Sequence, residues 1–163
     1  MRVWIGADEP GYPLKEALRK RLEERGIAYV DVGYRPDRPP EEQPDYPDVG
    51  LLVAQAVQRG EADRGILCCG TGIGMAITAN KVPGVRAALC HDVYSAQRAR
   101  MSNDAQVLTM GARVIGPEAA KVVLDAWIDA EFAGGASAPK VARVAEIEQE
   151  QWGSRSEETR RPG

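Results

Sequence analysis

The chain has 163 residues, of which 44% are hydrophobic and 28% charged, a balance typical of one soluble globular domain with a single large core. Its formal net charge of -3 gives no bulk attraction to nucleic acid or to anionic membranes, so neither is expected as a partner. No apolar run approaches the ~20 residues of a membrane span, and the opening segment "MRVWIGADEPG" lacks the pattern of a signal peptide, so we expect a cytoplasmic protein.

Strands and helices are expected to alternate from the start of the chain. Residues 2–5, "RVWI", form a short apolar strand that ends before a glycine. Leu14, Leu18 and Leu22 then recur every four residues, which places them on one face of a helix. Gly26 closes this helix, and residues 27–33 are a second strand.

The same alternation continues to the C-terminus. Residues 34–47 carry five of the eleven prolines and are expected to form a loop. After it, the pattern predicts a helix around 49–57, a strand at 64–69, a helix at 73–81, a strand at 85–90, a helix at 93–101, a strand at 106–110, a helix that opens at Pro117, and a last helix near 139–152. We expect one domain over residues 1–152 and a polar, disordered tail over 153–163.

Alternating strands and helices predict a parallel sheet with helices on both faces, joined by right-handed crossovers. Ligands bind such sheets at the carboxyl ends of the strands, where the strand order reverses. The residues that follow strands are therefore candidates for a site. They are Asp8 and Glu9, Cys69 to Gly74, His91 and Asp92, and Gly111 to Arg113.

A glycine-rich loop, Gly70 to Gly74, directly follows the third predicted strand. Its spacing is G-x-G-x-G instead of the G-x-G-x-x-G of dinucleotide-binding folds. The dinucleotide-binding pattern also includes an acidic residue about 20 positions later, and Asp92 is in that place. Nucleotide binding stays open as an alternative. No Gly-Lys-Ser/Thr follows the loop, which excludes a P-loop.

The adjacent Cys68 and Cys69 at the mouth of this loop do not fit a metal or redox site. Neighbouring residues of a strand point to opposite faces, the chain has one histidine, and no C-x-x-C is present. Cys69, however, ends its strand beside glycine N–H groups and a helix N-terminus, which favour a thiolate and can hold an oxyanion. The pattern leaves two interpretations of Cys69 open, a catalytic base and a small buried side chain. Cys68 and Cys90 are expected to be core residues.

Five segments together resemble the family of ribose-5-phosphate isomerase B and galactose-6-phosphate isomerase. They are "GADEPG", "DYP", "GILCCGTGIGMAITANKVPGVRAALC", "YSAQRARMSNDAQVLTMGARVIG" and "VLDAW", in one colinear order over roughly residues 1–150. The resemblance implies a Rossmann-like three-layer α/β/α sandwich with a five-stranded parallel sheet and an extra C-terminal helix. It also implies aldose–ketose isomerisation of sugar phosphates through a cis-enediol(ate), with no metal and no cofactor. The implied assembly is a homodimer or a dimer of dimers with shared active sites.

The resemblance also assigns roles to single residues. Cys69 is similar to the base that moves the proton between C1 and C2, and Thr71 belongs with Gly70, Gly72 and Gly74 to the loop that binds the enediolate oxygens. Asp8 resembles the aspartate that binds sugar hydroxyls, and Tyr46 the tyrosine near the substrate. Arg113 resembles an arginine of the phosphate site, and Asn103 an asparagine supplied by the adjoining subunit.

Three departures from the family pattern bear on the substrate. Glu9 stands where the family has a histidine, and Ser102 stands where the family has the histidine that opens the sugar ring. Lys140 and, one turn on, Arg143 align only loosely with the family's C-terminal arginine pair. His91 also follows a strand on the ligand side and is a candidate to replace the missing imidazole.

We therefore expect a metal-independent isomerase with ribose 5-phosphate as the default substrate. The alternative substrate is D-erythrose 4-phosphate or another open-chain sugar, which needs no ring opening, or an unphosphorylated sugar, because the Glu9 carboxylate disfavours a phosphate dianion beside it. An alternative of another class is a regulatory module that binds a nucleotide or a metabolite.

Overall fold

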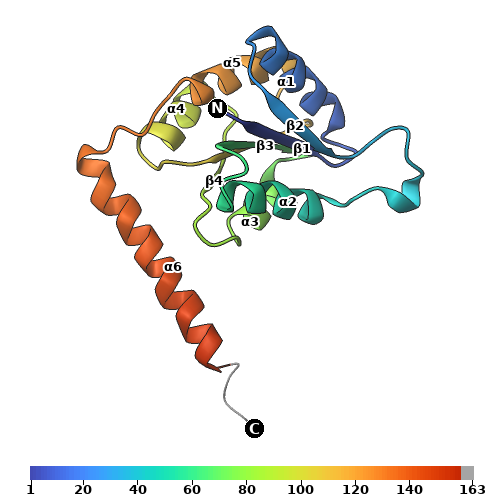
Figure 1. The fold of residues 1–163 in the computed structure, drawn as a ribbon. Coiled ribbons are helices and arrows are strands. Elements are labelled where there is room, and N and C mark those ends of the chain that lie inside the picture. Colours follow the sequence, from blue (N-terminus) through green and yellow to red (C-terminus); the bar gives the residue numbers. More distant parts are fainter. Residues whose placement is uncertain (159–163) are drawn as a thin grey trace.

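Five parallel strands form one sheet in the order β2-β1-β3-β5-β4. The computed structural model describes residues 1–158, with side chains described as far as Trp152 (Figure 1). The strands are β1 (Val3–Ala7), β2 (Tyr29–Gly33), β3 (Arg64–Cys69), β4 (Ala87–Leu89) and β5 (Val107–Gly111). The chain winds outward from β1 to β2 and then in the other direction from β3. The strand order therefore reverses between β1 and β3, which confirms the expected parallel α/β fold.

Helices cover both faces of the sheet and complete three layers (Figure 1). The helices are α1 (Tyr12–Glu24), α2 (Tyr46–Gln58), α3 (Ile73–Ala79), α4 (Val93–Met101), α5 (Pro117–Ile128) and α6 (Ala138–Glu158), with short 3-10 turns at Pro40–Glu42 and Gly135–Ser137. The buried side chains of α1, α4 and α5 form one core with one face of the sheet. Those of α2 and α3 form a second core on the opposite face. The leucine stripe of α1 is wholly inside the first core, as its four-residue spacing predicts.

Several element ends differ from the sequence-based expectation by a few residues. Helix α3 ends at Ala79, two residues earlier than expected. The cause is Asn80, whose side chain donates to the carbonyl of Ala76 and exchanges two hydrogen bonds with the backbone of Ala87. Such side-chain bonds compete with a further helical turn. They also fix the start of β4, which is limited to 87–89 and leaves Cys90 just beyond the strand. Helix α2 begins at Tyr46, inside the segment expected to be a loop.

Helix α6 stands apart from the rest of the molecule (Figure 1). A hydrogen bond from the Gly84 N–H to the Glu148 carboxylate links it to the loop before β4. Its backbone continues to Glu158, past the expected end near 152, while residues 159–163 of the expected disordered tail lie outside the described residues. No helix within residues 1–158 is both long and apolar enough to cross a bilayer.

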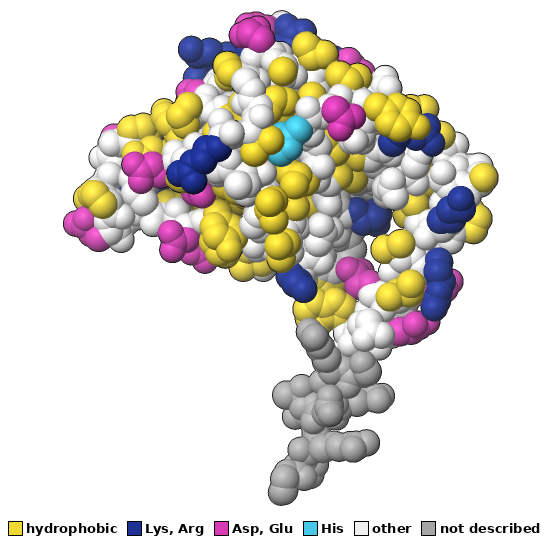
Figure 2. All heavy atoms as spheres, turned by 180° about the vertical axis from the view of Figure 1, so that it is seen from behind, with side chains coloured by type: hydrophobic (Ala, Val, Ile, Leu, Met, Phe, Trp, Pro, Cys, Tyr) yellow, Lys and Arg dark blue, Asp and Glu magenta, His cyan; other side chains and the backbone are white. Residues whose placement is uncertain are grey.

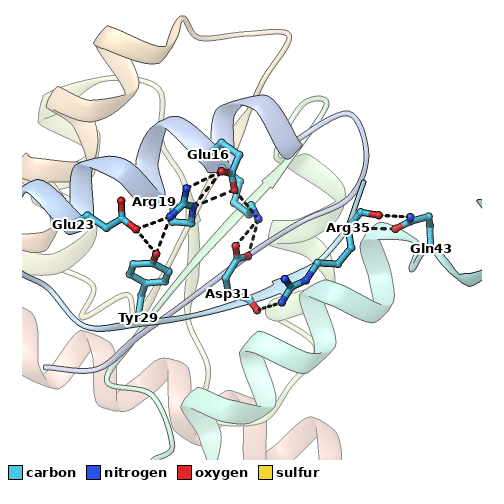
Figure 3. A network of polar contacts seen from close by, with 8 residues as sticks. Glu16, Arg19, Glu23, Tyr29, Asp31, Arg35 and Gln43 are labelled. Atoms are coloured by element: carbon cyan, nitrogen blue, oxygen red, sulfur yellow. Dashed lines mark hydrogen bonds and ion pairs between the residues drawn. The ribbon is translucent and has the colours of Figure 1, made fainter. Parts of the chain in front are cut away.

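A network of polar contacts ties α1 to β2 and to the proline-rich loop (Figure 3). Lys15 is buried, and its Nζ atom lies 2.7 Å from a carboxylate oxygen of Asp31 on β2. In the loop, the amide of Gln43 accepts from the N–H of Arg35 at 3.0 Å and donates to the Arg38 carbonyl at 2.8 Å. These bonds fix the path of the loop that leads into α2 at Tyr46.

Candidate active site

The reversal of strand order between β1 and β3 marks the expected ligand crevice. Asp8 directly follows β1, and Cys69 is the last residue of β3. The two strands are paired neighbours, with Ala7 opposite Cys68, so these two side chains emerge at adjacent strand ends. The fold thus brings together two of the candidates that were selected because they follow strands.

The adjacent thiols point to opposite faces of the sheet. Cys68 belongs to the core under α1, and Cys69 to the core under α2 and α3. Burial raises the pKa of the Cys68 thiol well above its ordinary value, and it raises the pKa of the Cys90 thiol to about 11. Cys68 and Cys90 are therefore thiols of the core, as expected. Among residues 1–152 no group of three or more His, Cys, Asp and Glu side chains could hold a metal ion.

Cys69 lies at the N-terminal end of α3, as its position before the glycine loop predicts. Its Sγ atom accepts a hydrogen bond of 3.0 Å from the N–H of Gly72, and 5% of the residue is exposed. Gly72 has a φ of +78° and is the N-cap of α3. A Cβ atom at Gly72 would lie 2.6 Å from Leu89 and 2.7 Å from the backbone of Met110. Only glycine therefore fits here, and its N–H fixes the sulfur at the helix start.

The aromatic ring of Tyr46 is packed against the next glycine of the loop. A Cβ atom at Gly74 would lie 2.5 Å from the ring. Tyr46 begins α2 and is 43% exposed, so part of this residue remains accessible beside the loop. The hydroxyl of Thr71, in the same loop, accepts a hydrogen bond of 3.3 Å from the N–H of Ile73. The fold thus gathers Tyr46 and Thr71 around the turn that follows Cys69.

Arg113 lies against Gly70, at the start of this loop, and its charge acts on Asp8. The Asp8 carboxylate accepts a hydrogen bond of 2.9 Å from the N–H of Gly11. Burial raises the pKa of Asp8 above its ordinary value, although the Gly11 bond and the charge of Arg113 act in the opposite direction. The Arg113 guanidinium lies 3.2 Å from where a Gly70 Cβ would be, and the backbone N–H of Arg113 donates to the Gly70 carbonyl. Arg113 therefore supplies positive charge beside both the loop and Asp8.

His91 follows β4 at the same end of the sheet, but its imidazole is engaged by the backbone. Its Nε2 atom accepts a hydrogen bond of 2.9 Å from the N–H of Gly111 at the end of β5. Burial lowers the pKa of His91, with a smaller opposing effect from Asp92. Asp92 itself caps α4 through a 2.7 Å bond from the N–H of Ser95. Only Nδ1 of His91 remains for a ligand.

Ser102 and Asn103 lie at the opposite end of the sheet from Cys69. They follow α4, which runs back from the carboxyl end of β4 to the amino end of β5. The backbone carbonyl of Asn103 accepts a hydrogen bond of 3.0 Å from Arg86, which precedes β4. One chain therefore cannot bring Asn103 and Cys69 to the same small substrate.

An arginine clamp that the sequence reasoning did not identify holds this second region. Asp104 has a φ of +48°, a left-handed conformation that is uncommon outside glycine but that asparagine and aspartate also adopt. Its carboxylate accepts hydrogen bonds of 2.9 Å from both Arg86 and Arg100. The clamp fixes the turn that presents Asn103. The only signal in the sequence is the spacing of four between residues 100 and 104, which is common in helices without such a role.

Ser102 and Asn103 line a cavity of about 730 Å³ between α4, β4 and the start of α6, which also includes Lys140 (Figure 2). The Ser102 hydroxyl oxygen is buried and has no hydrogen-bond partner among the described residues. Arg143 does not line this cavity, and its guanidinium pairs with Glu146 and Glu150 on its own helix. Glu9 is exposed next to Asp8. Apart from Arg143, the candidate site residues thus fall into two regions, one around Cys69 and one around Ser102.

Comparisons with known proteins identify the family. The family model described as Ribose/Galactose Isomerase matches residues 3–144. A D-erythrulose-4-phosphate isomerase of Pectobacterium atrosepticum is 52% identical over 151 residues, which cover 93% of this chain and 97% of the relative. A ribose-5-P isomerase B of Listeria innocua is 52% identical over 149 residues, which cover 91% and 98%.

A solved structure supports the same assignment. The ribose-5-phosphate isomerase B of Clostridium thermocellum superimposes with a TM-score of 0.87 at 46% identity, over 93% of this chain and 99% of the other. The family model covers most of the chain, and both sequence relatives match almost from end to end. The chain therefore belongs to the ribose/galactose isomerase family.

Proposed function

We propose that this protein interconverts the aldose and ketose forms of a four-carbon sugar phosphate. The observation that carries the proposal is the position of Cys69, whose sulfur accepts the Gly72 N–H at the start of α3, beside the crevice between β1 and β3. Family membership supports an isomerase, and the substitutions at Glu9 and Ser102 support a substrate without a closed ring.

The chemistry follows from the groups around the loop. The Cys69 thiolate takes the proton from C2 of the aldose. The electron pair of that C–H bond forms a double bond between C1 and C2, and the carbonyl pair moves to O1, which gives an enediolate. The first N–H groups of α3 have no acceptor within the helix and favour the developing negative charge. Cys69 then returns the proton to C1, while the hydroxyl proton moves from O2 to O1. Asp8 and Tyr46 are proposed to hold the remaining hydroxyls.

The four-carbon substrate is proposed because no imidazole is free at the ring-opening position. Ribose 5-phosphate closes into a furanose through its 4-hydroxyl, whereas in D-erythrose 4-phosphate that oxygen carries the phosphate. Ser102 replaces the family histidine, and the Nε2 atom of His91 is already bonded to the backbone. The relative in Pectobacterium atrosepticum is named for the four-carbon ketose phosphate.

Ribose 5-phosphate is the second candidate. The relative of Listeria innocua and the solved structure of Clostridium thermocellum are both named for it, at 52% and 46% identity. For this substrate the chain must open the ring with water or with the remaining Nδ1 atom of His91.

Initial rates on tetrose and pentose phosphates and on the free sugars test the proposal. We expect a higher kcat/KM for erythrulose 4-phosphate than for ribose 5-phosphate, and little effect of His91→Ala on the tetrose. Ser102→His should raise turnover of ribose 5-phosphate more than that of the tetrose. A wild type that prefers ribose 5-phosphate and loses this activity in His91→Ala would show that His91 is the substitute acid–base group.

The proposed active form is a homodimer, or a dimer of dimers, with active sites shared between copies. Cys69 and Asn103 lie at opposite ends of one sheet, so a second copy is needed to bring them together. Apolar side chains exposed along α2, α3, β4 and the start of α4 supply a surface for such an interface. They are Leu51, Leu52, Ile73, Ile77, Leu89, Val93 and Tyr94.

Co-expression of Cys69→Ala with Asn103→Ala tests the shared site. In a mixed dimer, one site combines both mutations and the other combines two intact halves. With random pairing, half of the dimers are mixed, so about a quarter of all sites are restored. If each site belonged to one chain, no intact site would form and activity would stay at the level of the single variants.

A reducing compartment is proposed for this protein. All three cysteines are unpaired and buried, which is typical of proteins kept in the cytoplasm.

A further inference from the structure

The cavity beside α4 is positively charged. Its polar lining consists of Arg86, Ser95, Arg98, Ser102, Asn103, Ser137 and Lys140, and none of the described residues that line it is an aspartate or a glutamate. Figure 2 shows the hollow between α6 and the body of the molecule. A cavity with three cations and no lining carboxylate favours an anion.

Two of the three cations are not neutralised within the chain. The Arg86 guanidinium pairs with Asp104 at 2.9 Å. Arg98 and Lys140, in contrast, have no ion pair or side-chain hydrogen bond with any described residue. Their charges are therefore available to a ligand.

Arg98 also shares a helix face with the unsatisfied hydroxyl. Arg98 and Ser102 are four residues apart on α4 and its C-cap, so their side chains lie on the same face. The Ser102 Oγ atom is buried without a partner. A guanidinium fork beside a free hydroxyl is a donor set that matches the oxygens of a phosphate group.

We propose that Arg98, together with Lys140, binds the phosphate group of the substrate whose carbon chain lies over Cys69 of a second copy. This inference rests on the proposed function and its shared site. Arg113 then binds the phosphate from the subunit that supplies Cys69, and Arg98 from the other. Arg143 is paired with two glutamates and has no free charge for the phosphate. Arg98 supplies that charge instead.

Direct binding of inorganic phosphate, measured by calorimetry, tests Arg98 without turnover. The variants are Arg98→Met, which keeps the helix propensity and most of the volume, Arg98→Lys, and Lys140→Met. Arg59→Met is the matched control, because Arg59 is an exposed arginine at the end of α2, outside the cavity. We expect Arg98→Met to weaken phosphate binding about 10- to 100-fold. Arg98→Lys should recover part of this loss, and the control should bind as wild type does.

Kinetics on matched substrates separate a phosphate contact from a structural role. For erythrulose 4-phosphate, kcat/KM should fall in Arg98→Met by the same factor as the phosphate affinity. For free erythrulose, kcat/KM should stay at the wild-type value, because this sugar carries no phosphate. An equal loss on both sugars would overturn the inference. Unchanged phosphate affinity in Arg98→Met would also overturn it. If light scattering then shows that the variant dimer dissociates, Arg98 pairs with a carboxylate of the partner instead of a phosphate.

The two proposals fail in different ways. If wild type isomerises sugar phosphates and Arg98→Met is unaffected, the role of Arg98 is wrong and the proposed function stands. If phosphate binding depends on Arg98 but no sugar phosphate is isomerised, the anion site stands and the proposed function is wrong.

Discussion

The two adjacent thiols allow the proposed base to be tested against a neighbour of the same chemistry. We expect Cys69→Ala to abolish isomerisation while the protein stays folded. Cys69→Ser is the sharper variant, because its hydroxyl keeps an acceptor for the Gly72 N–H, which now bonds the sulfur at 3.0 Å. Serine ionises far less readily than cysteine, so loss of activity in Cys69→Ser reports on proton transfer and not on the loop.

The expected effect of Cys69→Ala on catalysis is larger than its expected effect on the free energy of unfolding. Removal of a general base lowers kcat by ~10²–10⁴-fold, which corresponds to about 3–5 kcal/mol of transition-state free energy. In the folded state, Cys69→Ala loses one hydrogen bond and a small buried group, which costs about 1–2 kcal/mol. A domain with about 5–15 kcal/mol of stability tolerates that loss.

Cys68→Ala is the control. Cys68 is fully buried on the opposite face of β3, and burial keeps the pKa of its thiol far above neutral pH. We expect Cys68→Ala to lower the urea midpoint by an amount similar to that of Cys69→Ala and to retain most of its kcat. Activity in Cys69→Ser near the wild-type value, or a greater loss of kcat in Cys68→Ala, would refute the assignment of the base.

Three further substitutions follow from single contacts. Gly74→Ala places a methyl group 2.5 Å from the Tyr46 ring, so we expect the exposed ring to swing away, with KM raised and the melting temperature little changed. Burial disfavours the charged imidazole of His91, so its pKa in the folded state is lowered. Stability should therefore fall as pH drops below about 6.5, by at most about 1.4 kcal/mol per pH unit, and flatten below the folded pKa. His91→Gln should remove this slope in urea titrations. Arg86→Met removes half of the clamp beside Asn103, and kcat/KM should fall about tenfold, the loss of about one charged hydrogen bond.

The sequence predicts the layers of this fold well because their signals are local. The spacing of Leu14, Leu18 and Leu22 alone indicates the buried face of α1. The glycine run after β3 predicts both the helix start and the position of Cys69, because only a glycine N-cap permits the backbone to pass so close to β5. Element ends were less predictable: Asn80 ends α3 through bonds to Ala87, and nothing in the residue order announces that contact.

The candidate site was predictable only in part, because its two regions depend on different kinds of information. Residues at the carboxyl ends of β1 and β3 follow from topology, which places Asp8 next to Cys69. The engagement of His91 by the backbone of Gly111 depends on a contact across 20 residues and was found only in the structure. The role proposed for Arg98 could not be predicted from the sequence, because a single arginine on an exposed helix face is usually solvated.

The separation of the two regions is consistent with the proposed change of substrate at an unchanged catalytic base. The proposed base and enediolate loop are built on β3 and α3, where a Cβ atom at Gly72 would clash with Leu89 and with the backbone of Met110. Ser102 and Arg98 are built on α4, whose buried residues belong to the core on the opposite face of the sheet. By the proposal, a substitution on α4 therefore alters what the site recognises without moving the sulfur of Cys69. In the proposed mechanism, Cys69 exchanges the C2 proton of the substrate with solvent. Substitutions of Ser102 and Arg98 should therefore change the rate of this exchange less than they change the ratio of kcat/KM values for tetrose and pentose phosphates.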